Sequence, residues 1–430
     1  MTAPVSGRAL KDAWLHKALI RGAPFVFLVG FSHLAYQIWK HWDIITIDFR
    51  YFWLAGEMWT RGDNPYDAAY IEEARNRFDM QVGAIWVYAP NWFPIAAIQS
   101  LLSPLGGSRL WLIANGALLL GASWLNVRTL QFAKPARTDD RQLISDALMS
   151  APTFTLFLLH AGAVSLMQAA GNTLHLGQSS ILIYFGLSLL LYGMSGKRPW
   201  FGAIGLALVM LKPQIGIVLL PALGAFAYGR RVMVLAGSVS LLMAAPALII
   251  TPAPDILLSM AGRMLQYNDL FYNMPGAMTG LRHIVWALGG PDFGSGYYIL
   301  LALSASCGLA LAARGKLISG GPTALLYLTV VCFFFLAPLH VYDLVALGAV
   351  ALPAAVMRAP FGTASLAAFA VLWRAGNLPQ IGALEAAAPV YYPGSLYATL
   401  ACAALFAAML GAYGPKRAAS KRPTLAAVKA

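Results

Sequence analysis

Apolar runs, the longest of about 20 residues, recur along the whole chain and are separated by short polar segments. The first covers about residues 23–39, and the others lie between residues 86 and 413. A run of this length is long enough to cross the hydrocarbon core of a bilayer as a helix. Only 11% of the residues are charged, whereas soluble proteins carry about 25%. The pattern therefore predicts an all-α, polytopic integral membrane protein with about 12 transmembrane helices.

The charges predict how these helices are arranged in one transmembrane domain, residues 23–413. The N-terminal tail (1–22) and the C-terminal tail (414–430) are both basic, so both are expected in the cytoplasm, the second as a disordered segment. The loop 40–85 has eight acidic and five basic residues and is expected outside. A second outer loop is predicted at 251–296.

Within the first outer loop, polar and apolar residues alternate with a helical period. Phe49–Trp59 is expected to form a short amphipathic helix that lies in the membrane interface, anchored by Trp53 and Trp59. A second short helix is expected at Ala68–Phe78, with Asp67 as its N-cap.

Residues 86–130 leave two topologies open. They contain two apolar runs, 86–105 and 110–130, but the basic segment 128–146 is typical of a cytoplasmic loop and requires one crossing. Either the proline-rich run 86–105 does not cross completely, or the basic segment lies outside.

The net charge of +13 comes largely from short loops and the two ends. Positive-inside topology and contact with anionic membrane lipids explain such a distribution, so a nucleic-acid partner is not expected.

On this topology, the unusual polar residues gather at the outer face. Ionisable groups at membrane depth are costly, so each is a candidate for function. The candidates are Asp48, Arg50, Tyr66, Tyr88, Asn172, His175, Gln178, Lys212, Gln214, Arg282, His283, His340, Tyr342 and Asp343.

Several candidates have two interpretations. Asp48 is either a general base that deprotonates a sugar hydroxyl or the N-cap of the helix that follows it. Lys212 either binds a lipid phosphate or extends along the helix end to the interface. Gln178 either caps a helix or hydrogen-bonds a substrate, and Arg282 is either an interfacial anchor or a second phosphate ligand.

The chain has no nucleotide-binding motif and no cytoplasmic domain that could hold a nucleotide sugar. A transferase would therefore take its sugar from a lipid carrier. The histidines and acids lack the spacing of metal ligands, so neither a metal nor another cofactor is expected.

Six motifs follow one another along the chain: Asp48, the turn Gly62–Asp67, Tyr88-Ala-Pro90, Gly177-Gln178, Lys212-Pro213 and His340-x-Tyr342-Asp343. Their order resembles glycosyltransferase family 87 of the GT-C superfamily. The resemblance implies a GT-C-like helical bundle, a polyprenyl-phosphate-linked hexose donor, inversion at the anomeric carbon and Asp48 as the base. It places Lys212, Gln178 and His340 at the donor. Its best-known members are mannosyltransferases of bacterial envelope glycolipids.

Two departures affect what the resemblance implies. Ala89 stands where the family has a proline, and residues 273–280 match only loosely, so the acceptor of this chain can differ. The expected function is transfer of a hexose to an envelope glycolipid or glycan at the outer face of a bacterial inner membrane. The alternatives are a lipid or small-anion transporter that uses Asp48 and Lys212 as binding charges, and a non-catalytic envelope-assembly subunit. The acceptor, the hexose and the oligomeric state are not predicted.

Overall fold

A computed structural model describes residues 7–80, 85–132, 143–250, 256–268, 270–379, 381, 384, 391–392 and 394–414. These residues form helices and connecting turns, and among them the only β-type pairing is the single bridge between Thr279 and Leu339. The prediction of an all-α polytopic membrane protein is therefore confirmed.

Five helices are long and apolar enough to cross a membrane: α1 (Gly7–Lys40, apolar from Trp14), α5 (Pro104–Phe132), α12 (Ala227–Ile250), α15 (Gly294–Arg314) and α20 (Ser395–Tyr413). A sixth segment is the pair α7 (Thr153–Ser165) and α8 (Gln168–Leu176), which is bent by 61°. The shorter apolar segments are α9 (Ser180–Ser195), α10 (Pro199–Val209), α11 (Pro213–Gly224), α16 (Gly321–Leu336), η4 with α17 (Val341–Ala355) and α18 (Phe361–Trp373). Among the described residues, five segments, or six with the bent pair, are therefore long enough to cross a membrane, and the shorter apolar segments correspond to the other predicted runs.

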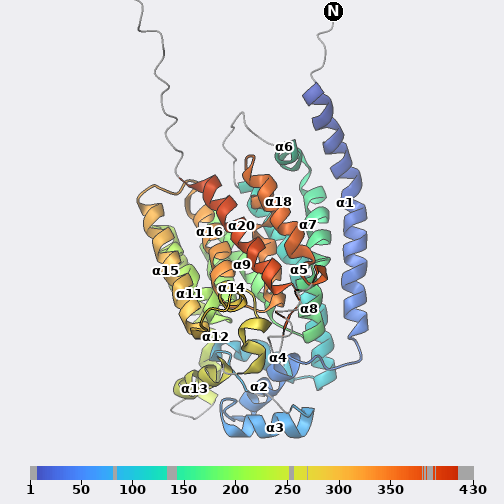
Figure 1. Ribbon diagram of the computed structural model, residues 1–430. Helices are drawn as coiled ribbons and strands as arrows, with labels where there is room; N and C mark the ends of the chain where they lie inside the picture. The colour runs from blue at the N-terminus through green and yellow to red at the C-terminus, as the bar shows by residue number, and fades with distance from the viewer. Residues whose placement is uncertain are drawn as a thin grey trace, which may run out of the picture.

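The remaining elements are short. They are α2 (Phe49–Arg61), α3 (Ala68–Phe78), η1 (Pro90–Trp92), α4 (Phe93–Ser100), α6 (Leu143–Ser150), α13 (Ile256–Asn268), η2 (Phe271–Asn273), η3 (Pro275–Ala277), α14 (Leu281–Ala287) and η5 (Ala375–Asn377). In Figure 1, α2, α3 and α13 lie at one end of the bundle, whereas α1 begins and α20 ends at the opposite end.

The run 86–105 does not cross the membrane. Its helix α4 has eight residues, and such a helix is about 12 Å long, less than half of a hydrocarbon core of about 30 Å. Helix α4 packs against α2 so closely that a Cβ on Gly56 would lie 2.1 Å from the carbonyl oxygen of Ala96. Of the two topologies left open, the structure therefore supports the first. Residues 133–142 of the basic segment lie outside the described residues.

Both short helices of the first loop form where they are predicted, but their side chains behave differently. Trp53 and Trp59 do not anchor the loop in the interface, because both are buried inside the protein. Phe52 stacks on Trp92 with ring centroids 4.7 Å apart. Asp67 precedes α3 without a side-chain capping bond, and its carboxylate accepts a hydrogen bond from Asn64 Nδ2 at 2.9 Å instead.

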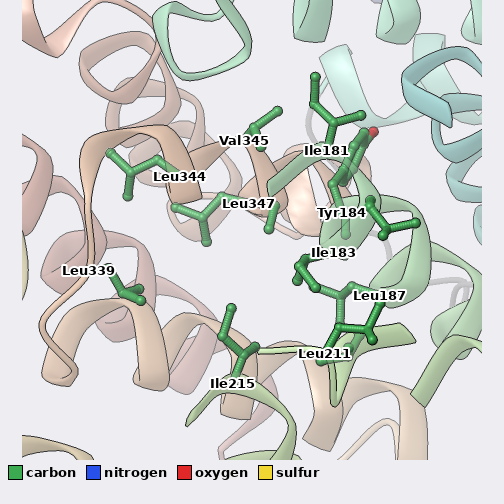
Figure 2. Packing of buried hydrophobic residues seen from close by; sticks show 14 of the residues in the cluster. Ile181, Ile183, Tyr184, Leu187, Leu211, Ile215, Leu339, Leu344, Val345 and Leu347 are labelled. Carbon is green, nitrogen blue, oxygen red and sulfur yellow. The ribbon is translucent and has the colours of Figure 1, made fainter. Parts of the chain in front are cut away.

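Three of the shorter segments meet inside the bundle and position the polar residues at their first turns. Helices α9 and α11 have 16 and 12 residues and are about 24 and 18 Å long, so they do not cover the whole core thickness. Apolar side chains near the N-terminal ends of α9, α11 and η4 belong to one buried cluster, in which Figure 2 labels Ile181, Ile215 and Leu344. This packing holds the starts of the three segments next to one another.

Candidate functional site: two adjoining cavities

Two cavities lie where these helix starts meet the first outer loop. The aspartate cavity, about 330 Å³, is lined by Asp48 and Gln178, and the lysine cavity, about 180 Å³, is lined by Lys212, Gln214 and Asp343. The two share one wall, formed by Val87, Tyr88, Tyr267, His340 and Tyr342. The fold thus brings eight of the predicted site residues together: Asp48, Tyr88, Gln178, Lys212, Gln214, His340, Tyr342 and Asp343.

Asp48 is held in its cavity by the turn that follows α8. Its backbone N–H donates to the carbonyl of Leu176 at 2.7 Å, and Gln178 Nε2 donates to its Oδ2 at 2.7 Å. Gly177 between these partners has φ = 75°, and a Cβ there would lie 2.1 Å from Thr46 Oγ1. The turn therefore requires glycine, both for its backbone conformation and for space. Asp48 precedes α2 but makes no side-chain capping bond.

Burial makes the Asp48 carboxyl a weaker acid than an exposed aspartate. Burial raises its pKa from the ordinary value of 3.8 to about 6, although the hydrogen bond from Gln178 and the charge of Lys212 both favour the carboxylate. A general base is most effective when its pKa lies near the working pH. Gln178 therefore orients the carboxylate in the cavity without eliminating its basicity.

Lys212 lies in the short connection between α10 and α11, directly before Pro213, the first residue of α11. It is a buried cation and only 5% exposed. Its ammonium donates to Asp343 Oδ1 at 2.5 Å and to Ser180 Oγ at 3.2 Å, and it lies 5.2 Å from the ring centre of Tyr342. An ammonium has three N–H donors. These two bonds leave the third for an oxygen in the lysine cavity.

His340 is a neutral imidazole in the shared wall. Burial lowers the pKa of His340 to about 4. The charge of Asp343 raises this pKa and the charge of Lys212 lowers it, both by smaller amounts. Its Nε2 lies 3.1 Å from Asn273 Oδ1, and its ring stacks on Tyr342 with centroids 5.0 Å apart. His340 can therefore offer a hydrogen bond but no charge.

Six predicted residues do not line either cavity. Arg282 donates to both carboxylate oxygens of Asp292, at 2.8 and 2.6 Å, and to Asn273 O and Ser295 Oγ, so it joins parts of the second loop. His283 is buried against Pro275 O. Arg50 donates to Phe78 O and Ile45 O, and the Tyr66 hydroxyl donates to Tyr88 O. The remaining two residues are Asn172 and His175, and His175 lies beside His41.

Tyrosines form much of the aspartate cavity, and the prediction from sequence missed most of them. Tyr51, Tyr267, Tyr272 and Tyr392 line it beside Tyr88 and Tyr342. They come from segments that are far apart in the sequence, so no local motif connects them. Ser180 was also missed, although it follows Gln178 within one polar run.

Comparison with known proteins shows the family to which the chain belongs. No curated protein matches it. The model of glycosyltransferase family 87 matches residues 86–341, more than half of the chain. The matched range contains Gln178, Lys212 and His340 from the two cavities, whereas Asp48 lies before it. The chain therefore belongs to glycosyltransferase family 87 and is a membrane glycosyltransferase.

Proposed function

We propose that this protein transfers a hexose from a polyprenyl-phosphate-linked donor to an envelope glycolipid or glycan, with Asp48 as the general base. The observation that carries the proposal is the pairing of a basic carboxylate and a buried ammonium in adjoining cavities with a common wall. A hydroxyl nucleophile needs the first group, and a departing phosphate needs the second.

The donor phosphate belongs in the lysine cavity. Lys212 has a donor left for a phosphate oxygen, and the side chains of Gln214 and His340 line the same space. Because Asp343 partly compensates Lys212, the cavity binds the phosphate without presenting an uncompensated buried charge when it is empty of ligand. The sugar of the donor then lies at the shared wall, between Lys212 and Asp48.

The reaction is a single displacement. Asp48 Oδ takes the proton of the acceptor hydroxyl while the hydroxyl oxygen forms a bond to the anomeric carbon from the side opposite the phosphate. The bond between that carbon and the phosphate oxygen breaks, and its electron pair stays on the leaving polyprenyl phosphate. Lys212 stabilises the negative charge that grows there. Mannose is the sugar expected from the best-known family members, and neither a metal nor another cofactor is assigned a role.

The charge pattern supports an outward-facing site in a bacterial inner membrane. The basic pair Lys197-Arg198 follows the end of α9 that is remote from the cavities. The pair Arg230-Arg231 lies in the first turns of α12, where Arg230 Nη1 donates to Gly224 O at the remote end of α11. Basic residues favour the cytoplasmic side, so the cavities belong to the opposite face.

The test is transfer of labelled hexose by the full-length protein in vesicles. The assay supplies polyprenyl-phosphate hexoses together with a glycolipid extract of the membranes that contain the protein. The expected product is a labelled glycolipid, formed from a polyprenyl-phosphate hexose but not from nucleotide sugars. If none of the lipid-linked hexoses is transferred while lipid or anion moves across the bilayer, the protein acts as a transporter and the proposal is wrong.

A further inference from the structure

We infer that the isoprenoid chain of the donor leaves the lysine cavity across Gly296, between α13 and α15, and passes directly into the lipid. The inference rests on the proposed function and identifies the route of the lipid part of that substrate. It depends on where the cavity opens, what covers its wall and which side of the bundle faces lipid.

The lysine cavity reaches the surface of the protein at one end of α15. Gly296 lines the cavity and is at the same time exposed, and a Cβ added there would meet no atom within 4 Å. The neighbouring Ser295, by contrast, is buried at the cavity wall. The opening is therefore bounded on one side by the backbone of the first turn of α15.

The walls next to this opening are apolar. Met264 of α13, Ile299 of α15 and Met278, which follows η3, all line the cavity. Methionine side chains are flexible and adapt to irregular apolar ligands. An isoprenoid chain is a branched hydrocarbon, so it matches such walls better than a hydrated sugar does.

The helix that carries Gly296 faces lipid. Helix α15 is one of the candidate spans, and only 22% of its most apolar stretch is buried. Leu300 on α15 and Leu265 on α13 are 63% and 70% exposed. A chain that leaves the cavity at this position therefore enters hydrocarbon, while its phosphate stays beside Lys212.

The donor, and not the acceptor, is assigned to this route because the buried ammonium lies in the lysine cavity and the base lies in the aspartate cavity. A lipid phosphate has its charge next to its first isoprene unit. The phosphate site and the opening for the chain must therefore belong to the same cavity.

The test narrows the opening and compares donors of different chain length. The variant is Gly296→Phe, and its matched control is Gly308→Phe on the same helix, because a Cβ at Gly308 also meets no atom within 4 Å and Gly308 does not line the cavity. Replacing a glycine inside a helix favours the helix, so both variants should fold.

For Gly296→Phe, the KM for a long-chain polyprenyl-phosphate hexose should rise about tenfold, which corresponds to the lost burial of roughly two methylene groups. The KM for a water-soluble donor with two isoprene units, and the KM for the acceptor, should stay near those of the wild type. Gly308→Phe should resemble the wild type with both donors. An equal rise in KM for both donors, a change confined to the acceptor KM, or no change in any KM would overturn the inference.

A second measurement does not depend on turnover. Polyprenyl phosphate with a diazirine in the isoprene units that follow the second is bound to the wild-type protein in vesicles and irradiated. Labelling of peptides from α13 and α15, reduced in Gly296→Phe, supports the route even if no hexose is transferred and the proposed function fails. Labelling confined to other helices contradicts it.

Discussion

Two buried cations of the outer region, Lys212 and Arg282, were both predicted as phosphate ligands, and the structure places them in different situations. Lys212 and its partner Asp343 are 6% and 5% exposed and line a cavity. Arg282 is 5% exposed, but its partner Asp292 is 37% exposed, and neither residue lines the aspartate cavity or the lysine cavity. All three guanidinium nitrogens of Arg282 donate to protein oxygens.

The difference separates a buried cation that faces a cavity from one whose nitrogens are all bonded to protein oxygens. Arg282 has bonds to Asp292, Asn273 and Ser295, so it joins three parts of the second loop and has little capacity for a ligand. Lys212 is attached to one carboxylate and one hydroxyl and faces open space. Burial alone does not separate the two; unused donors next to a cavity do.

The largest difference between the two pairs is expected when both charges of the Lys212–Asp343 pair are removed together. Breaking one partner of a buried ion pair costs about 3–5 kcal/mol because the other charge is left uncompensated. The double variant Lys212→Gln with Asp343→Asn avoids that cost and should stay folded. Its transfer rate at limiting donor should fall about 10- to 100-fold, the value of one hydrogen bond to a charged group.

The measurement is kcat/KM for the donor, with thermal unfolding as the control for folding. A double variant that is folded and retains the wild-type kcat/KM would mean that Lys212 does not bind the phosphate.

Acidification should affect the two regions at different pH values. The pKa of Asp48 is raised by burial to about 6, so the base is increasingly protonated as the pH falls through 6, and transfer at pH 5 should be about tenfold below its plateau. Hydrogen bonds from Arg282 lower the pKa of Asp292 below its ordinary value. The stability that this pair contributes is therefore fully present above the pKa of Asp292 in the unfolded chain. It is lost only as the pH falls through the lower pKa of the folded protein.

A pH–rate profile and unfolding temperatures measured over the same pH range test this contrast. Transfer and stability that decline together would mean that acid inactivates the enzyme through unfolding, and not through protonation of Asp48.

The smallest effect is expected for the corresponding double variant of the other pair, Arg282→Gln with Asp292→Asn. Because these residues reach the lysine cavity only through Asn273 and Ser295, transfer should fall at most a few-fold, about 1 kcal/mol in the activation barrier. Transfer per folded protein, measured with the same assay, decides the point. A loss as large as that of the Lys212 and Asp343 variant would show that the second loop acts directly on the substrate.

The sequence predicted the fold and the local elements of the site well because they depend on nearby residues. Apolar runs gave the membrane helices, and periodicity gave α2 and α3 within two residues of their ends. The same pattern could not show that Trp53 and Trp59 turn inward, because an aromatic face fits a protein core as well as a membrane interface.

The partners within the site lay beyond such reasoning. Gln178 lies 130 residues from Asp48, and Asp343 lies 131 residues from Lys212. No spacing rule connects positions that are joined only by helix packing. For the same reason, the sequence could not distinguish Lys212 from Arg282, since both are cations beside polar residues at the predicted outer face.

Asp48 is the proposed general base, and replacing its charge tests that role most directly. The variant Asp48→Asn keeps the shape of the side chain, and Asp43→Asn is the control from the same loop, since the Asp43 side chain is 83% exposed and pairs with Arg109. Burial disfavours the ionised form of Asp48, so the asparagine variant should be at least as stable as the wild type at pH 8.

The measurement is hexose transfer from the lipid-linked donor at pH 8. Loss of a general base predicts a fall of about 10²- to 10⁴-fold for Asp48→Asn, with Asp43→Asn near the wild-type rate. Transfer by folded Asp48→Asn within a few-fold of the wild type would contradict the assignment.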